Sequence, residues 1–216
     1  VFCDQEENLL RCYFASVDLQ DLNILFEKVP SDAVMDYIVK EELSEFSWVN
    51  DTLFRHYTTL ARHTYLDLCG EHEKSKHELF MEQFYEENFG EFATEKDAVE
   101  LYQMLYQIFD FRVSRLPSME ELLQLIRKKW VLLYREKGEI IAFLMYQIEG
   151  KKYYGYQIYN SGTADITYNL ERRAVEYAKE HYGVKSSYSW TEIGNLGANK
   201  RAGEIDGTFD YIFVKR

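Results

Sequence analysis

The stretch from Tyr159 to Ala178, YNSGTADITYNLERRAVEYA, most constrains how this chain folds, because it joins a strand to a helix through a glycine. Aromatic residues before Gly162 are typical of a β-strand, and the apolar residues after it recur at helical spacing. The first backbone N–H groups of a helix have no partner within it, so they form a site where an anion binds. The sequence therefore predicts a mixed α/β domain, with either an anion-binding turn or an ordinary helix start at this point.

Composition favours a packed globular protein and argues against nucleic-acid binding. Of the 216 residues, 46% are hydrophobic and 16% aromatic, which is enough to bury a core. The formal net charge of −12 offers no basic surface to neutralise nucleic-acid phosphates. No apolar run approaches the roughly 18 residues of a membrane span, so we predict no membrane insertion.

The cysteines predict no disulfide framework and no metal site. Cys3, Cys12 and Cys69 are scattered and lack a CxxC spacing. In the absence of an apolar signal segment, we expect reduced thiols and a cytoplasmic protein. Cys69, His72 and His77 could ligate a metal, but their spacing fits no structural zinc pattern.

Hydrophobic periodicity predicts alternating elements along the chain. In the first 68 residues, strands are expected at 9–17, 33–41 and 58–68, and helices at 18–29 and 44–57. A charged stretch at 69–88 follows, with a helix that we interpret as a connector. From residue 89 the pattern predicts a strand, two helices, a three-stranded meander with turns at 136–138 and 149–151, a helix at 164–182, a strand, a short helix and a last strand.

Within this second part, two capping signals stand out. Thr94 and Asp97 are in capping-box position, and Gly183 is a helix stop.

The element order after residue 89 resembles the GNAT superfamily of acyl-CoA-dependent N-acyltransferases. The segment ATEKDAVELYQMLYQIFD is similar to the family's first strand-helix unit, and KGEIIAFLMYQIEGKK is similar to its second hairpin. GNLGANKR resembles the Asn-x-x-Ala that opens its last helix, which aligns Asn195 and Ala198. The resemblance implies an α+β fold with a central mixed sheet flanked by helices over 89–216. Residues 1–68 resemble a partial second copy, so a tandem arrangement with a connector at 69–88 is expected.

In this family the loop after the fourth strand, Gln/Arg-x-x-Gly-x-Gly/Ala, holds the pyrophosphate of coenzyme A. The resemblance therefore implies acetyl-CoA or another acyl-CoA as cofactor, bound by Ser161, Gly162, Thr163, Ala164, Asp165, Ile166 and Asn195. Ala164 fits a small-residue position of the motif, and Ile166 does not. Asp165 would repel an anion unless Arg172 or Arg173 folds back. The alternative is that Thr163 caps an ordinary helix and Asp165 supports it.

Acyl transfer requires a base for the amine and an acid for the departing thiolate. The family's acid is frequently a tyrosine of the last helix, which ANKRAGEIDG lacks. Glu192 is the candidate base, and Tyr156 or Tyr159 the candidate acid. Strand alternation predicts Tyr154, Tyr156 and Ile158 on one face and Tyr159 on the other. The alternative for these tyrosines is a structural role in the sheet.

The resulting hypothesis is an N-acyltransferase that acts on a small-molecule or peptide amine. Net acidity favours a cationic acceptor through long-range attraction. Two alternatives use the same fold: a non-catalytic binding or interaction module, and a structural dimerisation protein.

Overall fold

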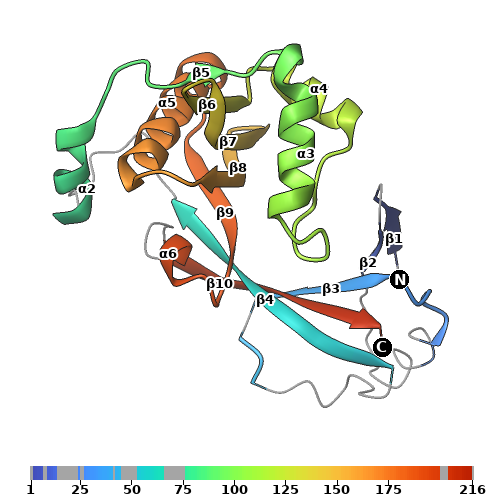
Figure 1. Ribbon diagram of the computed structural model, residues 1–216. Helices are drawn as coiled ribbons and strands as arrows, with labels where there is room; N and C mark the ends of the chain where they lie inside the picture. The colour runs from blue at the N-terminus through green and yellow to red at the C-terminus, as the bar shows by residue number, and fades with distance from the viewer. Residues whose placement is uncertain are drawn as a thin grey trace. The chain divides into compact units, whose positions relative to one another are not determined.

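The computed structural model describes residues 2–6, 9–13, 24, 27–40, 42–44, 53–65, 76–199 and 204–215. They form a mixed α/β fold, as predicted, whose contacts divide the chain into two compact units (Figure 1). Unit 1 comprises residues 1–63, 104–118 and 190–216, and unit 2 comprises residues 64–103 and 119–189.

The predicted meander forms the sheet of unit 2 and is confirmed together with its two turns. The sheet contains β5 (Glu91–Phe92), β6 (Val131–Glu136), β7 (Glu139–Glu149), β8 (Lys152–Asn160) and the start of β9 (Ser186–Glu192). Strands β5 to β8 are antiparallel neighbours, and β9 runs parallel to β8. Lys137, Gly138 and Gly150 have φ of 54°, 91° and 62°, which turns the chain sharply at both hairpins.

Helix α5 (Ala164–Tyr182) packs on β6, β7 and β8, and α4 (Met119–Arg127) also contacts β7. Figure 1 shows α5 and α4 on either side of these strands. The buried stripe of α5 follows the helical period: Ile166, Leu170, Ala174 and Ala178. The helix ends at Gly183, whose φ of 61° is the left-handed stop that the sequence predicted.

A helix lies in the connector region, as predicted, and the predicted capping signal precedes α3. The connector region contains α2 (Lys76–Met81) and the 3₁₀ turn η1 (Glu82–Phe84). The 3₁₀ turn η2 (Glu95–Asp97) leads into α3 (Ala98–Ile108), and at its N-cap the Thr94 backbone N–H donates to Asp97 Oδ2 at 2.7 Å. This bond confirms the reciprocal contact expected of a capping box.

Unit 1 brings both ends of the chain into one sheet. Its elements are β1 (Phe2–Gln5), β2 (Leu10–Tyr13), β3 (Val34–Val39), β4 (Phe54–Tyr65), β10 (Glu204–Lys215), the end of β9, and α6 (Leu196–Asn199). The strand order is β1-β2-β3-β10-β4-β9. Strand β4, from the N-terminal third of the sequence, therefore lies between β9 and β10, which come from the C-terminal part. The tandem origin of residues 1–68 stays a prediction.

The predicted helix at 44–57 is wrong from Phe54 to Tyr57, because these residues begin β4. Phe54 is fully buried in a cluster with Met35 and Phe213, and this core contact overrides the helical periodicity. Residues 45–52 of the same prediction lie outside the described residues. The strands predicted at 33–41 and 58–68 are confirmed at Val34–Val39 and through Tyr65.

The predicted strand at 9–17 is confirmed over Leu10–Tyr13, and its last residues lie outside the described residues. Of the helix predicted at 18–29, Ile24 and Glu27 are helical, and most of the rest is likewise outside.

The expectation of reduced thiols is wrong for Cys12, which is disulfide-bonded. Cys3 is opposite Cys12 in the β1–β2 register. Cys69 and His72 lie outside the described residues. Among the described helices, none combines the length and apolar character needed to cross a bilayer.

Candidate functional site

Asn160 organises the turn between β8 and α5, here named the 160–166 turn. Its Oδ1 accepts the Gly162 N–H at 2.8 Å, and its Nδ2 donates to the Thr163 carbonyl at 2.7 Å and to Thr167 Oγ1 at 2.8 Å. Both ends of this short amide are directed into the turn, as is common for asparagine before a glycine. Asn160 was not among the predicted site residues, although the Asn-Ser-Gly spacing carries this signal.

Ser161 anchors the same turn to the sheet. Its backbone N–H and its hydroxyl both donate to the Ile141 carbonyl, each at 3.0 Å. The predicted cofactor ligand Ser161 is therefore committed to β7 in this structure.

The first turn of α5 has backbone N–H groups without acceptors. Thr163 occupies the N-cap position with φ −87° and ψ 160°, but its side chain makes no capping bond. The Ile166 N–H donates to the Thr163 carbonyl at 3.2 Å, whereas the N–H groups of Ala164 and Asp165 have no partner among the described residues. Thr163 is thus the N-cap residue, as the alternative predicted, but without a side-chain capping bond. Two donors at a helix N-terminus remain available to an anion.

Ile166, the residue that departs from the GNAT motif, packs against Gly162. A Cβ at Gly162 would lie 2.6 Å from Ile166 Cδ1 and 3.4 Å from Ile141 Cδ1. Ile166 is only 7% exposed, so its side chain is held between the turn and β7. Glycine is needed here because of this close packing.

A β-bulge in β8 changes the predicted faces of the tyrosines. Met145 pairs with Gln157 and Tyr146 pairs with Gly155, so Tyr156 is the extra residue. Tyr154 and Ile158 consequently lie on opposite faces, and the predicted alternation is wrong beyond the bulge. The Tyr156 ring contacts the Tyr154 ring at a centroid distance of 5.7 Å.

Tyr159, the other predicted acid, lies opposite Phe143 on β7. The two ring centroids are 5.7 Å apart. This contact gives the ring a packing role of the kind that the structural alternative predicts.

The pairing of β8 with β9 covers only the first half of β8. The register runs from Lys152–Ser186 to Gly155–Ser189. Strand β8 then continues to Asn160, past the bulge and into the 160–166 turn. The bulge and the end of this register coincide at Gly155–Tyr156.

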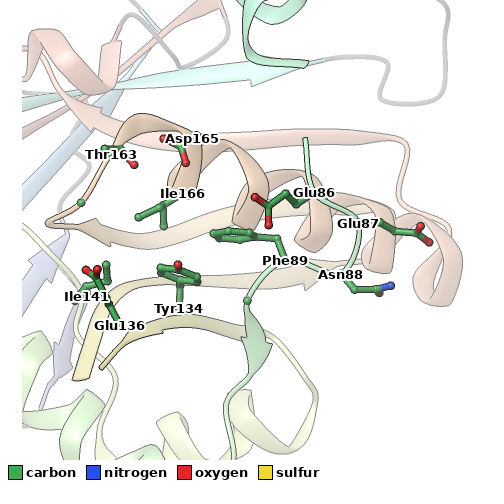
Figure 2. A pocket seen from close by; sticks show the side chains of 12 residues that line it. Glu86, Glu87, Asn88, Phe89, Tyr134, Glu136, Ile141, Thr163, Asp165 and Ile166 are labelled. Atoms are coloured by element: carbon green, nitrogen blue, oxygen red, sulfur yellow. The ribbon is translucent and has the colours of Figure 1, made fainter. Parts of the chain in front are cut away.

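A pocket of about 530 Å³ lies on the sheet side of the turn (Figure 2), within the volume range of small-molecule sites. Its lining residues are Glu86, Glu87, Asn88, Phe89, Gly90, Tyr134, Glu136, Ile141, Gly162, Thr163, Asp165 and Ile166. Figure 2 shows Ile166, Phe89 and Tyr134 gathered near its middle. The Phe89 and Tyr134 rings stack at 4.6 Å with an interplanar angle of 13°. We call this the acidic pocket, because its described lining includes four carboxylates and no Lys or Arg.

Neither arginine of α5 neutralises Asp165. Arg173 Nη1 donates to the carbonyls of Asn88 at 2.8 Å and Phe89 at 2.9 Å, and also to that of Gly90. Arg172 pairs with Glu176 at 3.1 Å. Arg173 thus holds the segment at residues 88–90 and Arg172 pairs within α5, so neither arginine offsets the charge of Asp165.

The last two predicted residues lie in unit 1. Glu192 ends β9, is exposed, and accepts a hydrogen bond from the Thr58 hydroxyl at 2.5 Å. The Asn195 side chain accepts the Ala198 N–H at 3.1 Å at the start of α6. Of the predicted residues, the structure thus brings Ser161 to Ile166 together in one turn and places Glu192 beside Asn195, whose N–H donates to the Glu192 carbonyl at 2.9 Å.

Several residues of the site were not predicted. Glu86, Phe89 and Tyr134 come from a connector, a short loop and a strand that no sequence pattern groups together. Asn169 ties two of these parts together, because its side chain accepts the Glu86 N–H at 2.8 Å and donates to the Asp165 carbonyl at 3.0 Å.

Comparison with solved structures identifies the fold. A GCN5-related N-acetyltransferase from Sphaerobacter thermophilus superposes with a TM-score of 0.60 at 12% identity, covering 98% of this chain and 74% of that one. A GNAT-family acetyltransferase from Novosphingobium aromaticivorans superposes with a TM-score of 0.56 at 11% identity, covering 97% and 84%. No family model matches the sequence, and no curated protein matches it. At these identities the similarity establishes the architecture, and the chain has the fold of the GNAT superfamily of N-acetyltransferases.

Proposed function

We propose that this chain is an acyl-CoA-dependent N-acyltransferase that transfers an acyl group to an amine. The observation that carries the proposal is a pair of backbone N–H groups at the start of α5, on Ala164 and Asp165. Neither has an acceptor among the described residues. These groups follow the end of β8, in the part of the chain beyond the residues of β8 that pair with β9. In a GNAT fold this is a suitable place for the phosphates of coenzyme A.

The residues that would hold the cofactor are those of the 160–166 turn. Ala164 and Asp165 would donate their N–H groups to phosphate oxygens, and Asn160 would keep the turn in the required conformation. Acyl-CoA would supply the activated thioester. The Asp165 carboxylate opposes this binding, because it would repel the phosphates. A like charge about 5 Å away costs on the order of 3 kcal/mol at an effective dielectric constant near 20, before salt screening.

The reaction needs two proton transfers from groups of the chain. The amine must lose a proton before its nitrogen bonds to the acyl carbon, and the sulfur must gain one as the C–S bond breaks. We assign the first role to Glu192, whose Oε1 is oriented by the Thr58 hydroxyl. Tyr156, displaced from the regular strand by the bulge, is the stronger candidate for the second role, with Tyr159 as the other.

The acceptor that this chemistry favours is a cationic small-molecule or peptide amine. The net charge of −12 gives the chain a long-range attraction for such a substrate.

Thermal unfolding with added ligand tests the proposal. A ligand present at 100 times its Kd should stabilise the folded chain by about 2.7 kcal/mol. We expect CoA and acetyl-CoA to raise Tm and desulfo-CoA to do so equally, because the phosphates carry the binding. Adenosine is the matched control and should give no shift. If millimolar CoA leaves Tm unchanged, the proposal fails.

The acidic pocket favours a second candidate, a non-catalytic module that binds a cationic small molecule. Its carboxylates attract a cation, and its stacked Phe89 and Tyr134 rings offer an aromatic surface to one. Stabilisation by spermidine that is lost in Glu136→Gln, without any response to CoA, would favour this candidate.

A further inference from the structure

Unit 1 contains a cluster of buried charges that the proposed reaction does not use. Asp36 on β3 is 2% exposed, and Asp210 on β10 is 4% exposed. In the β3–β10 register, Asp36 is opposite Ile212 and Asp210 is opposite Ile38, so the two carboxylates are diagonal neighbours on one face.

The arginines of the cluster are bound to carboxylates other than Asp210. Arg11 on β2, which is fully buried, pairs with Asp36 at 2.8 Å and with Glu6 at 2.6 Å. Arg115 pairs with Asp36 at 3.3 Å. Within the described residues, Asp210 Oδ1 has no hydrogen-bond partner. This described cluster therefore holds three carboxylates and two guanidinium groups, and its charges balance only when one carboxyl is protonated.

The face that buries Asp210 is covered by residues 109–118, which join α3 to α4 and which we call the 109–118 segment. Phe111 and Val113 pack on a cluster that includes Val34 and Ile212. Arg11 fastens the segment by donating to the carbonyls of Phe111 at 3.1 Å and Arg112 at 3.3 Å. The Tyr57 hydroxyl on β4 also donates to Asp110.

We propose that Asp210 is the proton-binding group of a pH-sensitive lock, in which the 109–118 segment closes over β2, β3 and β10 while Asp210 is protonated and opens as the pH rises. An ionised Asp210 would need water or donors that its Oδ1 lacks among the described residues of the closed form. If the closed segment makes ionisation of Asp210 less favourable, then by thermodynamic linkage ionisation of Asp210 makes the closed form less favourable by the same free energy.

The charges around Asp210 set the direction of the effect. Burial and then the Asp36 charge raise the pKa of Asp210, Arg115, Arg11 and the Tyr37 backbone N–H lower it, and the balance is a pKa of about 8. Further charged and titratable groups described in this region are Glu6, Tyr13 on β2, Asp110 and Arg112 on the segment, Arg55 and Tyr57 on β4, and the Arg62–Asp206 pair of β4 and β10. A hydrated aspartate has a pKa near 3.9, so the open form loses its proton at much lower pH than the closed form. Opening therefore increases up to tenfold per pH unit as the pH approaches about 8, and levels off above it.

Hydrogen exchange of the segment's amides tests the lock. Between pH 6 and 8 the intrinsic exchange rate rises about tenfold per pH unit, and the change in opening should add a second factor of up to about ten. We expect log rate against pH to have a slope near two in the wild type and near one in Asp210→Asn. The matched control is Asp206→Asn on the same strand. Its carboxylate is already paired with Arg62 at 2.7 Å, so the slope should stay near two. A slope of one in the wild type would overturn the proposal.

A titration of the wild type keeps the test decisive if Asp210→Asn does not fold. The ¹³Cγ resonance of Asp210 reports its ionisation directly. A midpoint well above pH 6 supports the lock, and an Asp210 that is ionised throughout at pH 6 refutes it.

Discussion

The contact between Gly162 and Ile166 makes a quantitative prediction for the 160–166 turn. A Cβ at residue 162 would lie 2.6 Å from Ile166 Cδ1, which is too close for the two atoms to coexist without movement. Ile166 is 7% exposed and therefore has little room to turn away. We expect Gly162→Ala to cost about 1–3 kcal/mol of unfolding free energy through overpacking.

A double-mutant cycle isolates this contact. Ile166→Val removes Cδ1 and should cost about 1 kcal/mol alone. In the double variant the methyl group introduced at residue 162 takes up part of the vacated space, because its other neighbours, Asn160 Oδ1 and Ile141 Cδ1, are at 3.4 Å. The double variant should then be at least about 1 kcal/mol more stable than the sum of the single effects predicts. The assay is urea unfolding followed by circular dichroism. Additive single effects would refute the packing argument for Gly162.

Individual contacts elsewhere in the chain lead to four more predictions. Gly90→Ala should destabilise the fold by about 2–5 kcal/mol in urea unfolding, because its φ is +70° and a Cβ would lie 2.8 Å from the Leu133 carbonyl oxygen. The control Gly150→Ala, at φ +62° with nothing described within 4 Å, should cost only about 1–2 kcal/mol. Equal losses in the two variants would contradict the steric argument. Asp165→Asn should tighten CoA binding at least about fivefold to tenfold by calorimetry, since it removes a like charge whose unscreened cost is reduced by salt, and unchanged affinity would place the phosphates elsewhere. Asp97→Asn should cost about 1 kcal/mol of unfolding free energy at pH 7. Burial raises the pKa of Asp97, but hydrogen bonds from Thr94 and Arg135 lower it overall, so the difference in stability should be present above pH 4 and vanish as the pH falls through the folded pKa. A difference that persists at pH 2 would contradict the capping role. Glu192→Gln should reduce the rate of acyl transfer about 10²-fold or more and leave CoA binding unchanged, and full activity would remove Glu192 from the mechanism.

Local chemistry made much of unit 2 predictable. Gly183 ends α5 because a left-handed residue is needed there, and Thr94 with Asp97 marks the start of a helical segment. Such signals depend only on residues within a few positions of each other. The element order built from them was sufficient to indicate the GNAT fold, which the structural comparison confirms.

Features that depend on distant residues were not predictable. Phe54 begins a strand because its side chain is buried beside Phe213, which is far away in the sequence. The bulge at Tyr156 is defined by the pairing with β7, and the only local sign of it is Gly155 inside the strand, which does not by itself fix which residue is extra. The Asp36–Asp210 pair likewise requires the β3–β10 register. Single-sequence periodicity contains none of this information.

The candidate site was predicted in its turn and missed in its surroundings. Ser161 to Ile166 do form one turn at the start of α5, as the strand–glycine–helix pattern indicated. The acidic pocket beside it was not expected, because Glu86, Tyr134 and Glu136 come from separate elements. Their roles, like those of Glu192 and Tyr156, stay predictions.

The central claim is that the N–H groups of Ala164 and Asp165 bind the phosphates of coenzyme A. Titration of the ¹⁵N-labelled chain with CoA, followed by backbone amide NMR, observes these two groups directly. The account predicts that their proton resonances move downfield in a saturable manner and by more than those of the acidic pocket. If both stay in place at millimolar CoA, or if only the pocket residues respond, the account is contradicted.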